Sequence, residues 1–472
     1  MGRMKNNKAF RIGAGAAAAV VLLSACAGTS ALAPAAPEAR RPAAPAVSEL
    51  KVPHVAYRER RLPNGLQVLS IADRGSPTVT VQVWYHVGGR NDPPGRSGFA
   101  HLFEHMMFKG TEYLKAEQFD RLTEDVGGFN NAFTSDDVTG YHSVVPSNHL
   151  ETLLWAEAER MMNLKVDEAT FRSERSVVQE EYRQRILASP YGLFFNAVTT
   201  QPYLEHPYKR SAIGSIEDLE AATLADVVAF HARYYRPDNA TLIVAGDFDA
   251  AQLDAWVDKY FGPIRRPAEP LPEFKGSEPA WTADRSLTIT APTVPLPAVA
   301  LVWQAPPLKS PDAAALQVAA AVLAAGESSR LHQSLVYRQQ IATQAGFEAN
   351  LRAGPGLLIA YAVAAGGKPI AEISASLLAE LRRIVDSPPT PAELDKVKNQ
   401  LITQAFVSRQ TPFGLASAMG EAAVLEGDPA RINTALEELQ RVSAADVRRV
   451  VRQYVLGAHK VTMDYRQAGA RP

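Results

Sequence analysis

The feature that most constrains the fold of this 472-residue chain is a weak internal repeat. Residues 216–219 (Ile-Glu-Asp-Leu) align with residues 436–439 (Leu-Glu-Glu-Leu) at an offset of 220. The same ungapped alignment gives further matches: 225–227 with 445–447 (both Ala-Asp-Val), and Tyr234 with Tyr454. In both halves a helical pattern then leads into a final strand. Such a repeat predicts two homologous domains.

Each half mixes strand and helix signals. Pro63-Asn64-Gly65 is typical of a hairpin turn, and the alternation of Val79, Val81, Val83 and Tyr85 predicts a strand with one buried face. A helix is expected from Pro146-Ser147 onward, with Ser147 as its cap, and the box Thr390-Pro391-Ala392-Glu393 begins another. We therefore expect an α+β fold of two homologous domains, each a mostly antiparallel sheet flanked by helices.

Composition divides the chain further. Five prolines between 263 and 280 indicate a linker, so we expect an N-terminal domain over 51–262 and a related C-terminal domain over 281–468. Apolar residues make up 46% of the chain, as in globular proteins. The net charge is −1 and there is no basic block, which argues against a nucleic-acid partner.

The N-terminus is typical of an export signal. Basic residues precede an apolar run at 14–23, which is too short to span a bilayer and ends in Leu23-Ser24-Ala25-Cys26. Cys26 is the only cysteine, and small residues before it resemble a lipobox. We predict a lipoprotein signal over 1–25, lipidation of Cys26, and an Ala/Pro-rich tether over 26–50. The alternative is an ordinary signal peptide with Cys26 incidental.

These features predict a location. No aspartate follows Cys26, which by resemblance to Gram-negative lipoproteins favours anchoring to the outer membrane, facing the periplasm. With one cysteine no intrachain disulfide is possible, so an exported body must be stabilised by its core.

The pentapeptide His101-Leu102-Phe103-Glu104-His105 carries the chemistry. On a helix, residues i, i+3 and i+4 lie on one side, so both imidazoles and the carboxylate point the same way. Two histidines one turn apart can bind zinc beside a carboxylate that handles a proton. This is the inverted zincin pattern.

A second helix is predicted after Asp167, its expected cap. Phe171, Glu174, Val178 and Glu181 form one stripe on it, so both carboxylates face inward and need a partner. That partner is either a cation such as Arg175 or Arg183, or a metal held by Glu181. Glu180 is the alternative ligand, but it lies about 100° round the helix from Glu181 and off the stripe.

Together these residues resemble the M16 zinc peptidases, the insulinase–pitrilysin group, and most closely the short-chain members that include mitochondrial processing peptidase. Glu181 follows His105 by 76 positions, close to the family spacing, and Glu174-Arg175 matches the glutamate–arginine pair seven residues before it. Further matches are Phe108-Lys109-Gly110-Thr111, Asn131-Ala132-Phe133-Thr134, Asp137, Arg236-Pro237-Asp238-Asn239 and Gly246-Asp247-Phe248.

The resemblance implies roles for these residues. His101, His105 and Glu181 would bind one Zn²⁺ per chain, Glu104 would be the general base, and Glu174 would orient a ligand or the attacking water. The family holds substrate along an exposed strand edge, which here corresponds to Asn131, Ala132, Phe133 and Thr134. Phe133 would pack either on the substrate or on the core. For His54, His86, His149, His206 and His231 we expect ordinary surface or hydrogen-bonding roles, while His142 lies nearer the site.

The resemblance also implies a partner chain, because the family builds a closed chamber from four such domains and this chain has two. Many members carry an arginine and a tyrosine that grip the substrate, and Val336 and Thr343 stand at those positions here. Tyr337 and Arg338 could compensate in a shifted register. The simpler hypothesis is a heterodimer with a metal-less sister subunit that carries the pair; a homodimer is the alternative.

The sequence thus predicts a zinc metalloendopeptidase that cleaves peptides or unfolded polypeptide segments. The competing hypothesis is a non-catalytic M16-like scaffold or assembly subunit. The complete set of ligands and base favours the enzyme. Maturation of one dedicated precursor and general peptide turnover are not distinguished by the sequence.

Overall fold

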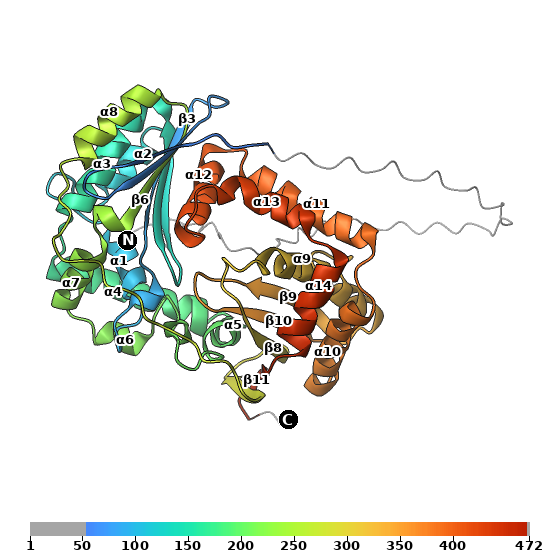
Figure 1. Cartoon of the computed structure of the whole chain (residues 1–472). Coiled ribbons are helices and arrows are strands. Elements are labelled where there is room, and N and C mark those ends of the chain that lie inside the picture. Colours follow the sequence, from blue (N-terminus) through green and yellow to red (C-terminus); the bar gives the residue numbers. More distant parts are fainter. Residues whose placement is uncertain (1–52, 470–472) are drawn as a thin grey trace, which may run out of the picture. The chain divides into compact units, whose positions relative to one another are not determined.

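The protein is described by a computed structural model over residues 53–469, so the predicted signal, Cys26 and most of the tether lie outside the described residues. Its strands form two sheets (Figure 1). The first has the order β1-β2-β6-β3-β5-β4, with β1 (Arg58–Arg61), β2 (Gln67–Ala72), β3 (Thr78–Tyr85), β4 (Phe129–Thr134), β5 (Thr139–Pro146) and β6 (Ala240–Gly246). The second has the order β7-β11-β8-β10-β9, with β7 (Arg285–Ala291), β8 (Ala298–Ala305), β9 (Ala342–Asn350), β10 (Gly356–Ala364) and β11 (Lys460–Gln467).

Helices surround both sheets. In the first half they are α1 (Phe99–Met106), α2 (Gln118–Glu124), α3 (Leu150–Asn163), α4 (Glu168–Tyr182), α5 (Gly192–Thr200), α6 (Ile216–Glu220), α7 (Leu224–Tyr234) and α8 (Ala250–Phe261). In the second half they are α9 (Ala313–Ala324), α10 (Ile370–Asp386), α11 (Pro391–Ser408), α12 (Pro412–Gly420), α13 (Arg431–Arg441) and α14 (Ala444–Val451).

The predicted duplication is confirmed at the level of whole elements. The pairs β3 and β8, α3 and α10, α5 and α12, and β6 and β11 each begin 220 residues apart. The strand order is also the same once β1 is set aside, and β2–β6 corresponds to β7–β11 as the parallel pair in a sheet that is otherwise antiparallel. The predicted α+β class and the two homologous, mostly antiparallel halves are therefore correct.

The sequence patterns predicted local structure correctly where a side chain interacts with residues close to it in the chain. The β1–β2 hairpin forms, Asp167 caps α4 by accepting from Thr170 N, and Thr390 with Glu393 makes the capping box of α11. The prediction for Ser147 was wrong. A 3₁₀ turn over Ser147–His149 precedes α3, and the Ser147 hydroxyl donates to Asp247 instead of capping the helix.

The two halves exchange one helix each. Helix α12 from the second half packs on the first sheet, where Ala416 and Met419 lie in a buried cluster with Leu69, Trp84 and Ile243. Helix α5 from the first half contributes its apolar residues to a buried cluster with β8, β10 and β11 of the second sheet; these residues are Phe194, Ala197 and Val198. Each sheet is therefore covered on one face by its own helices and on the other by a helix of the other half.

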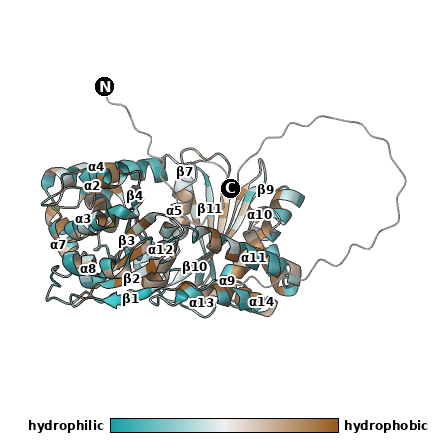
Figure 2. Cartoon of the chain, turned by 90° about the horizontal axis from the view of Figure 1, so that it is seen from above, coloured by the Kyte–Doolittle hydropathy of each residue, from teal (hydrophilic) through white to brown (hydrophobic). Residues whose placement is uncertain are grey.

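This exchange corrects the prediction for β3, whose residues from Val79 to Tyr85 are buried on both faces. The valines face the core of the first half, and Trp84 faces α12. Figure 2 shows hydrophobic colour on the strands and alternating hydrophobic and hydrophilic colour along the helices around them. The sequence alternation identified one buried face, but the second is buried only because a helix 330 residues later in the chain covers it.

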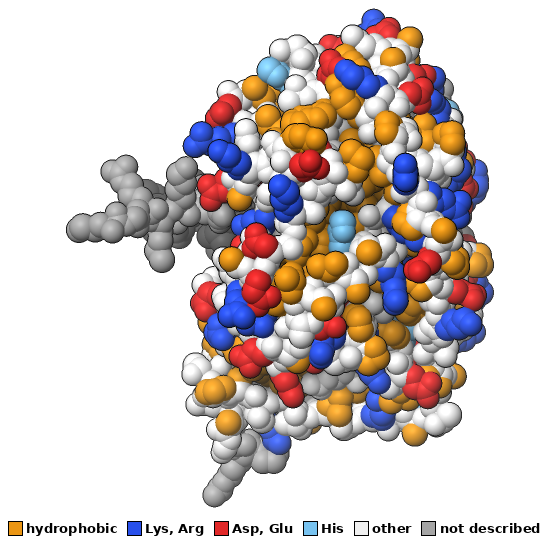
Figure 3. Space-filling view, turned by 90° about the vertical axis from the view of Figure 1, so that its left-hand side faces the viewer, with side chains coloured by type: hydrophobic (Ala, Val, Ile, Leu, Met, Phe, Trp, Pro, Cys, Tyr) orange, Lys and Arg blue, Asp and Glu red, His pale blue; other side chains and the backbone are white. Residues whose placement is uncertain are grey.

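The outer surface carries mixed charge. On the face shown in Figure 3, basic and acidic side chains are interspersed. This agrees with the net charge of −1 and with the absence of a basic block in the sequence. Within residues 53–469, the helices are all too short or too polar to span a bilayer.

We predict that Gly420→Ala destabilises the protein by about 1–3 kcal/mol, although alanine normally favours a helix. A Cβ at Gly420 would lie 2.4 Å from Cε2 of the buried Trp84 ring, so helix and sheet must separate. Urea unfolding measures the change. Gly366→Ala is the control, because a Cβ there meets nothing within 4 Å and stability should stay unchanged. Equal stability of the two variants would contradict close packing of α12 on β3.

Candidate metal centre

Helix α1 is held in place at its N-terminus by a buried carboxylate and by the close approach of its backbone to that of Gly214. Asp92 accepts hydrogen bonds from Gly98 N (2.7 Å) and Ala100 N (2.9 Å), which satisfies two helix-start amides. Gly98 has φ +92° and passes the Gly214 backbone so closely that a Cβ would lie 2.9 Å from the Gly214 Cα. Leu102 and Phe103 are buried in the core of the first half. The helix is thus fixed in position and rotation.

The structure brings the three predicted metal ligands together. His101 lies on α1 with His105 one turn later, and Glu181 lies near the end of α4, which packs on α1. Glu181 Oε2 is 3.6 Å from His101 Nε2 and 3.4 Å from His105 Nε2. One ligand atom from each of the three residues lies within 4.8 Å of the others, and no second group of this kind occurs among residues 53–469.

These distances fit zinc. Zinc–nitrogen and zinc–oxygen bonds of about 2.0–2.2 Å in tetrahedral geometry place neighbouring ligand atoms about 3.3–3.6 Å apart. Two imidazoles and one carboxylate are also a known donor set for catalytic zinc, and three protein ligands leave the fourth position open. Glu180, the alternative third ligand, points elsewhere, since it contacts Arg183 and Gln184 on the exposed side of α4.

The charges around the ligands are balanced by neighbouring groups. Glu174 is buried, with Oε2 3.7 Å from His105 Nδ1 and Oε1 3.0 Å from Lys109 Nζ. Arg185, one turn beyond Glu181, contacts Glu181 Oε1 at 2.7 Å. Glu174 therefore supports the ring of His105 from behind, as carboxylates commonly do for zinc-binding histidines. The predicted role of Glu174 fits this position, while Lys109 and Arg185 are cations whose roles the sequence reasoning did not assign.

The pKa values of the ligands in the metal-free chain follow from these contacts. Burial, aided by His105, lowers the pKa of His101 to about 4, so this ring is neutral and can bind metal. Burial alone would raise the pKa of Glu181, but His105, His101 and Arg185 lower it to about 2. Burial opposes charge on His105, yet contacts with Glu174 and Glu181 raise its pKa to about 9. The raised pKa favours the protonated form of His105, so a metal ion bound there would displace a proton.

Glu104 lies beside the ligands on the same helix. Its Oε2 accepts a hydrogen bond from Thr134 Oγ1 at 2.6 Å. Burial raises the pKa of Glu104, and the Thr134 hydroxyl opposes that shift. A carboxylate held in this way, next to the open side of a metal centre, suits a general base. Thr134, predicted from the family resemblance to bind substrate, has its hydroxyl engaged with Glu104.

The predicted substrate strand lies at the edge of the first sheet. Among the described residues, β4 pairs only with β5. Asn131 is exposed, and its Oδ1 accepts from Ala132 N at 2.8 Å, so a peptide that pairs with Ala132 competes with this side chain. Phe133 packs edge-on against Trp84, with ring centroids 5.0 Å apart. Phe133 therefore makes the core contact that was one of the two roles predicted for it.

The second half lacks such a centre. At an offset of 220, the positions of His101, Glu104, His105, Glu174 and Glu181 correspond to Ala321, Ala324, Ala325, Leu394 and Leu401. All five lie in or against the buried core of that half. The second half thus has helices equivalent to those that carry the predicted metal ligands in the first half. In the second half, apolar side chains fill the space between these helices.

The stretch aligned with the family's arginine–tyrosine pair forms a π-helical segment, His332–Arg338, followed by β9. Val336 packs partly against the core, and Thr343 is exposed. Tyr337 and Arg338, which could compensate, are both exposed on this segment.

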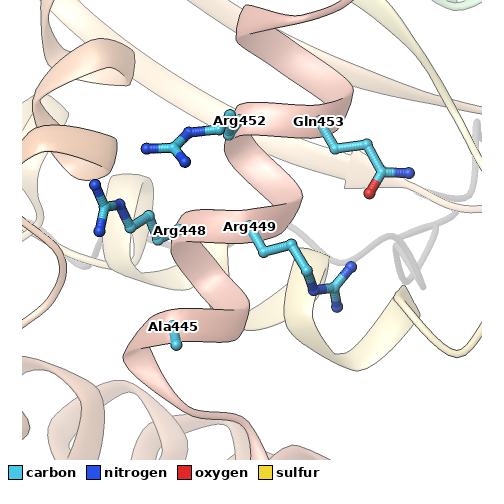
Figure 4. Close-up of a pocket in the computed structure, with 5 residues that line it drawn as sticks. All are labelled: Ala445, Arg448, Arg449, Arg452 and Gln453. Carbon is cyan, nitrogen blue, oxygen red and sulfur yellow. The ribbon is translucent and has the colours of Figure 1, made fainter.

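A surface hollow in the second half offers no comparable chemistry. A hollow of about 330 Å³ on α14 is lined by Ala445, Arg448, Arg449, Arg452 and Gln453 (Figure 4). Arg449 donates to Asp312 at 2.7 Å, and all the lining residues come from one helix and its continuation. The hollow brings together no acid, base or metal ligand, so the metal centre is the better candidate.

Three histidines outside the centre pack against aromatic rings. His206 is buried between Tyr208 and Phe274, and His231 stacks on Phe103. His142 packs against Phe413 with ring centroids 4.8 Å apart.

Comparison with known proteins agrees with this geometry. The family described as Insulinase (Peptidase family M16) matches residues 67–215, and the Peptidase M16 inactive domain matches residues 221–401. The zinc protease PqqE of Helicobacter pylori is 32% identical over 410 residues, covering 85% of this chain and 91% of that protein. The chain belongs to the M16 peptidase family.

Other relatives extend the likeness. A probable mitochondrial-processing peptidase subunit beta of Arabidopsis thaliana is 24% identical over 409 residues, covering 84% of this chain and 76% of that protein. The crystal structure of a protease from Helicobacter pylori superimposes with a TM-score of 0.84 at 29% identity, covering 87% of this chain and 99% of that one. The periplasmic protease PqqL of Escherichia coli shares the fold at 19% identity, with a TM-score of 0.72, and covers 87% of this chain and 47% of that one. The comparisons support a peptidase function, and the names of the relatives support zinc.

We predict that Glu181→Gln lowers zinc affinity by more than about 100-fold, because the change removes a charged ligand and even supporting residues cost 10- to 100-fold. Competition with a chromophoric chelator measures it. Glu180→Gln is the matched control, one residue away and pointing to solvent, and should bind zinc as the wild type does. Loss of affinity in the control, with none in Glu181→Gln, would reassign the ligand.

Proposed function

We propose that this chain is the catalytic subunit of a zinc-dependent endopeptidase that hydrolyses peptides or unfolded polypeptide segments. The observation that carries the proposal is the convergence of His101, His105 and Glu181, with Glu104 beside them on the same helix. The competing scaffold hypothesis is weaker, because a chain that only supports assembly has no need for a complete donor set next to a held carboxylate.

Zinc bound by His101, His105 and Glu181 would polarise the scissile carbonyl and make water acidic enough to attack near neutral pH. The remaining steps fall to the protein. Glu104 takes the proton from the attacking water and passes it to the leaving amine. Thr134 holds the Glu104 carboxylate through its hydroxyl, and Glu174 with Lys109 holds the ring of His105. The open edge of β4 pairs with the substrate backbone, through Asn131, Ala132 and Phe133.

The division of the chain is part of the proposal. We assign residues 51–262 to the catalytic domain, 263–280 to a linker and 281–468 to the non-catalytic domain. The positions of the two sheets support this, since their strands lie within 58–246 and 285–467.

The location is also proposed from the sequence, as a periplasmic protein anchored by lipid at Cys26 to the outer membrane. One solved relative is titled a periplasmic protease.

We predict that Glu104→Gln keeps zinc but lowers kcat by about 10²- to 10⁴-fold, the usual contribution of a positioned general base. Glutamine keeps the shape and can still accept from Thr134, but it cannot take a proton. Cleavage of a quenched peptide library and metal analysis of the same preparation measure the two effects. Glu168→Gln, on the exposed start of α4, is the control. Normal turnover by Glu104→Gln would refute the mechanism.

We further propose that the chain works with a second, metal-less M16-like subunit that supplies the arginine–tyrosine pair. The aligned positions, Val336 and Thr343, cannot bind a substrate carbonyl through a cation or a phenol. The purified chain alone should therefore cleave peptides slowly, and adding an M16-like subunit encoded beside it should raise kcat/KM at least about tenfold. Full activity of the chain alone, as monomer or homodimer, would rule out the heterodimer.

A further inference from the structure

The two faces of strand β4 have different surroundings. Side chains alternate between the faces of a strand. Thr134 faces α1, because its hydroxyl donates to Glu104, and Asn130 lies on the same side and donates to Thr123. Phe133 faces α12, because it packs on Trp84, and Phe129 lies on the same side with its ring 6.1 Å from that of Phe413. One face thus carries the chemistry, and the other is aromatic.

Phe129 is exposed in an unusual place. Half of its surface, 49%, is open at the free edge of the sheet, where proteins usually put charge or proline. Its ring is backed by His142, at 6.4 Å between centroids, and by Phe413. Those two rings also contact each other at 4.8 Å. The result is an aromatic platform with one open side, formed by Phe129, His142 and Phe413.

The platform combines both halves of the chain. Phe129 and His142 come from β4 and β5, whereas Phe413 comes from the first turn of α12. Helix α12 is fixed there by Gln82, whose Nε2 donates to Phe413 O at 3.1 Å. Burial lowers the pKa of His142 to about 4, so its ring is neutral at physiological pH. The platform is therefore uncharged, rigidly backed and continuous with the open edge of β4.

We propose that Phe129, His142 and Phe413 form a specificity subsite for an aromatic or large aliphatic side chain of an extended peptide substrate. The proposal rests on the proposed peptidase function. A peptide strand beside β4 places alternate side chains within about 5 Å of those of β4 on the same face. Its residue opposite Phe129 would bring an apolar side chain onto the open side of the platform, where an aromatic contact is favourable.

The position of the subsite along the substrate follows from strand geometry. Phe129 precedes Thr134, the residue bound to Glu104, by five positions, which is about 17 Å at 3.3 Å per residue. The recognised side chain therefore lies about five residues from the scissile bond. An antiparallel substrate places it on the C-terminal side of that bond, and a parallel one on the N-terminal side.

The test uses the complete protein, with its partner subunit if activity requires it. Quenched peptides share one cleavable bond and carry Phe or Ser four to six residues away on either side. The wild type should show a kcat/KM about tenfold higher for a Phe peptide than for its Ser counterpart, a typical effect of one apolar group. Phe129→Ser should remove this preference, and Phe129→Tyr should keep it.

Phe195→Ser is the matched control, since Phe195 is also an exposed phenylalanine, 41% open, but lies on α5 against Tyr361 of β10 in the second sheet. It should keep the preference. An unchanged Phe-to-Ser ratio in Phe129→Ser, or an equal loss in Phe195→Ser, would overturn the subsite. If the wild type cleaves none of the peptides, the proposed function fails. The subsite is then tested by the Kd values of the same peptides, which should be lower for Phe than for Ser peptides in the wild type and equal in Phe129→Ser.

Discussion

Both sheets of this protein need cover on two faces, and each half supplies the helix that the other half's sheet lacks. Helix α12 covers Trp84 of the first sheet, and α5 packs its own Phe194 against the second sheet. Without the helix from the other half, the apolar second face of each sheet would be exposed to water. Such exposure is unfavourable. The half that carries the candidate metal centre thus depends on the other half for its fold, although no matching group of candidate ligands occurs in the latter.

The same exchange links the fold to the chemistry. The face of the first sheet that receives α12 lies opposite the face that carries α1. Strand β4 is the edge strand of this sheet. On one face Thr134 donates a hydrogen bond to Glu104, and on the other face Phe133 packs on Trp84. Because both faces are fixed, the edge strand is held rigidly, which would reduce the entropy lost on binding the proposed peptide substrate.

The candidate metal centre shows how the protein tolerates buried charge. Glu104, Glu174 and Glu181 crowd around His105, and burial of each carboxylate alone would be costly. Lys109 and Arg185 offset part of that charge, and the contacts of His105 with Glu174 and Glu181 raise its pKa, which favours its positively charged form. A divalent cation would take over that compensating role. In the second half, where Ala321, Ala325 and Leu401 occupy the equivalent positions, no such compensation is needed and the space is closed by apolar packing.

By itself, the sequence determined what local chemistry and spacing can encode. The repeat at an offset of 220 predicted two similar halves, and the positions of His101, Glu104 and His105 on one helix face followed from helix geometry alone. The stripe on α4 predicted an inward Glu181, because residues seven apart share a helix face.

Only the tertiary structure decided which elements meet. It placed α12 on β3, so that a strand predicted to have one buried face has two, and it set Lys109 against Glu174 and Thr134 against Glu104. It also joined Phe413 to Phe129 across nearly 300 residues of chain. Periodicity reports which face of an element is apolar, but it carries no information about the distant segment that covers that face, because long-range packing depends on the complementary shapes of surfaces that form only when the chain folds.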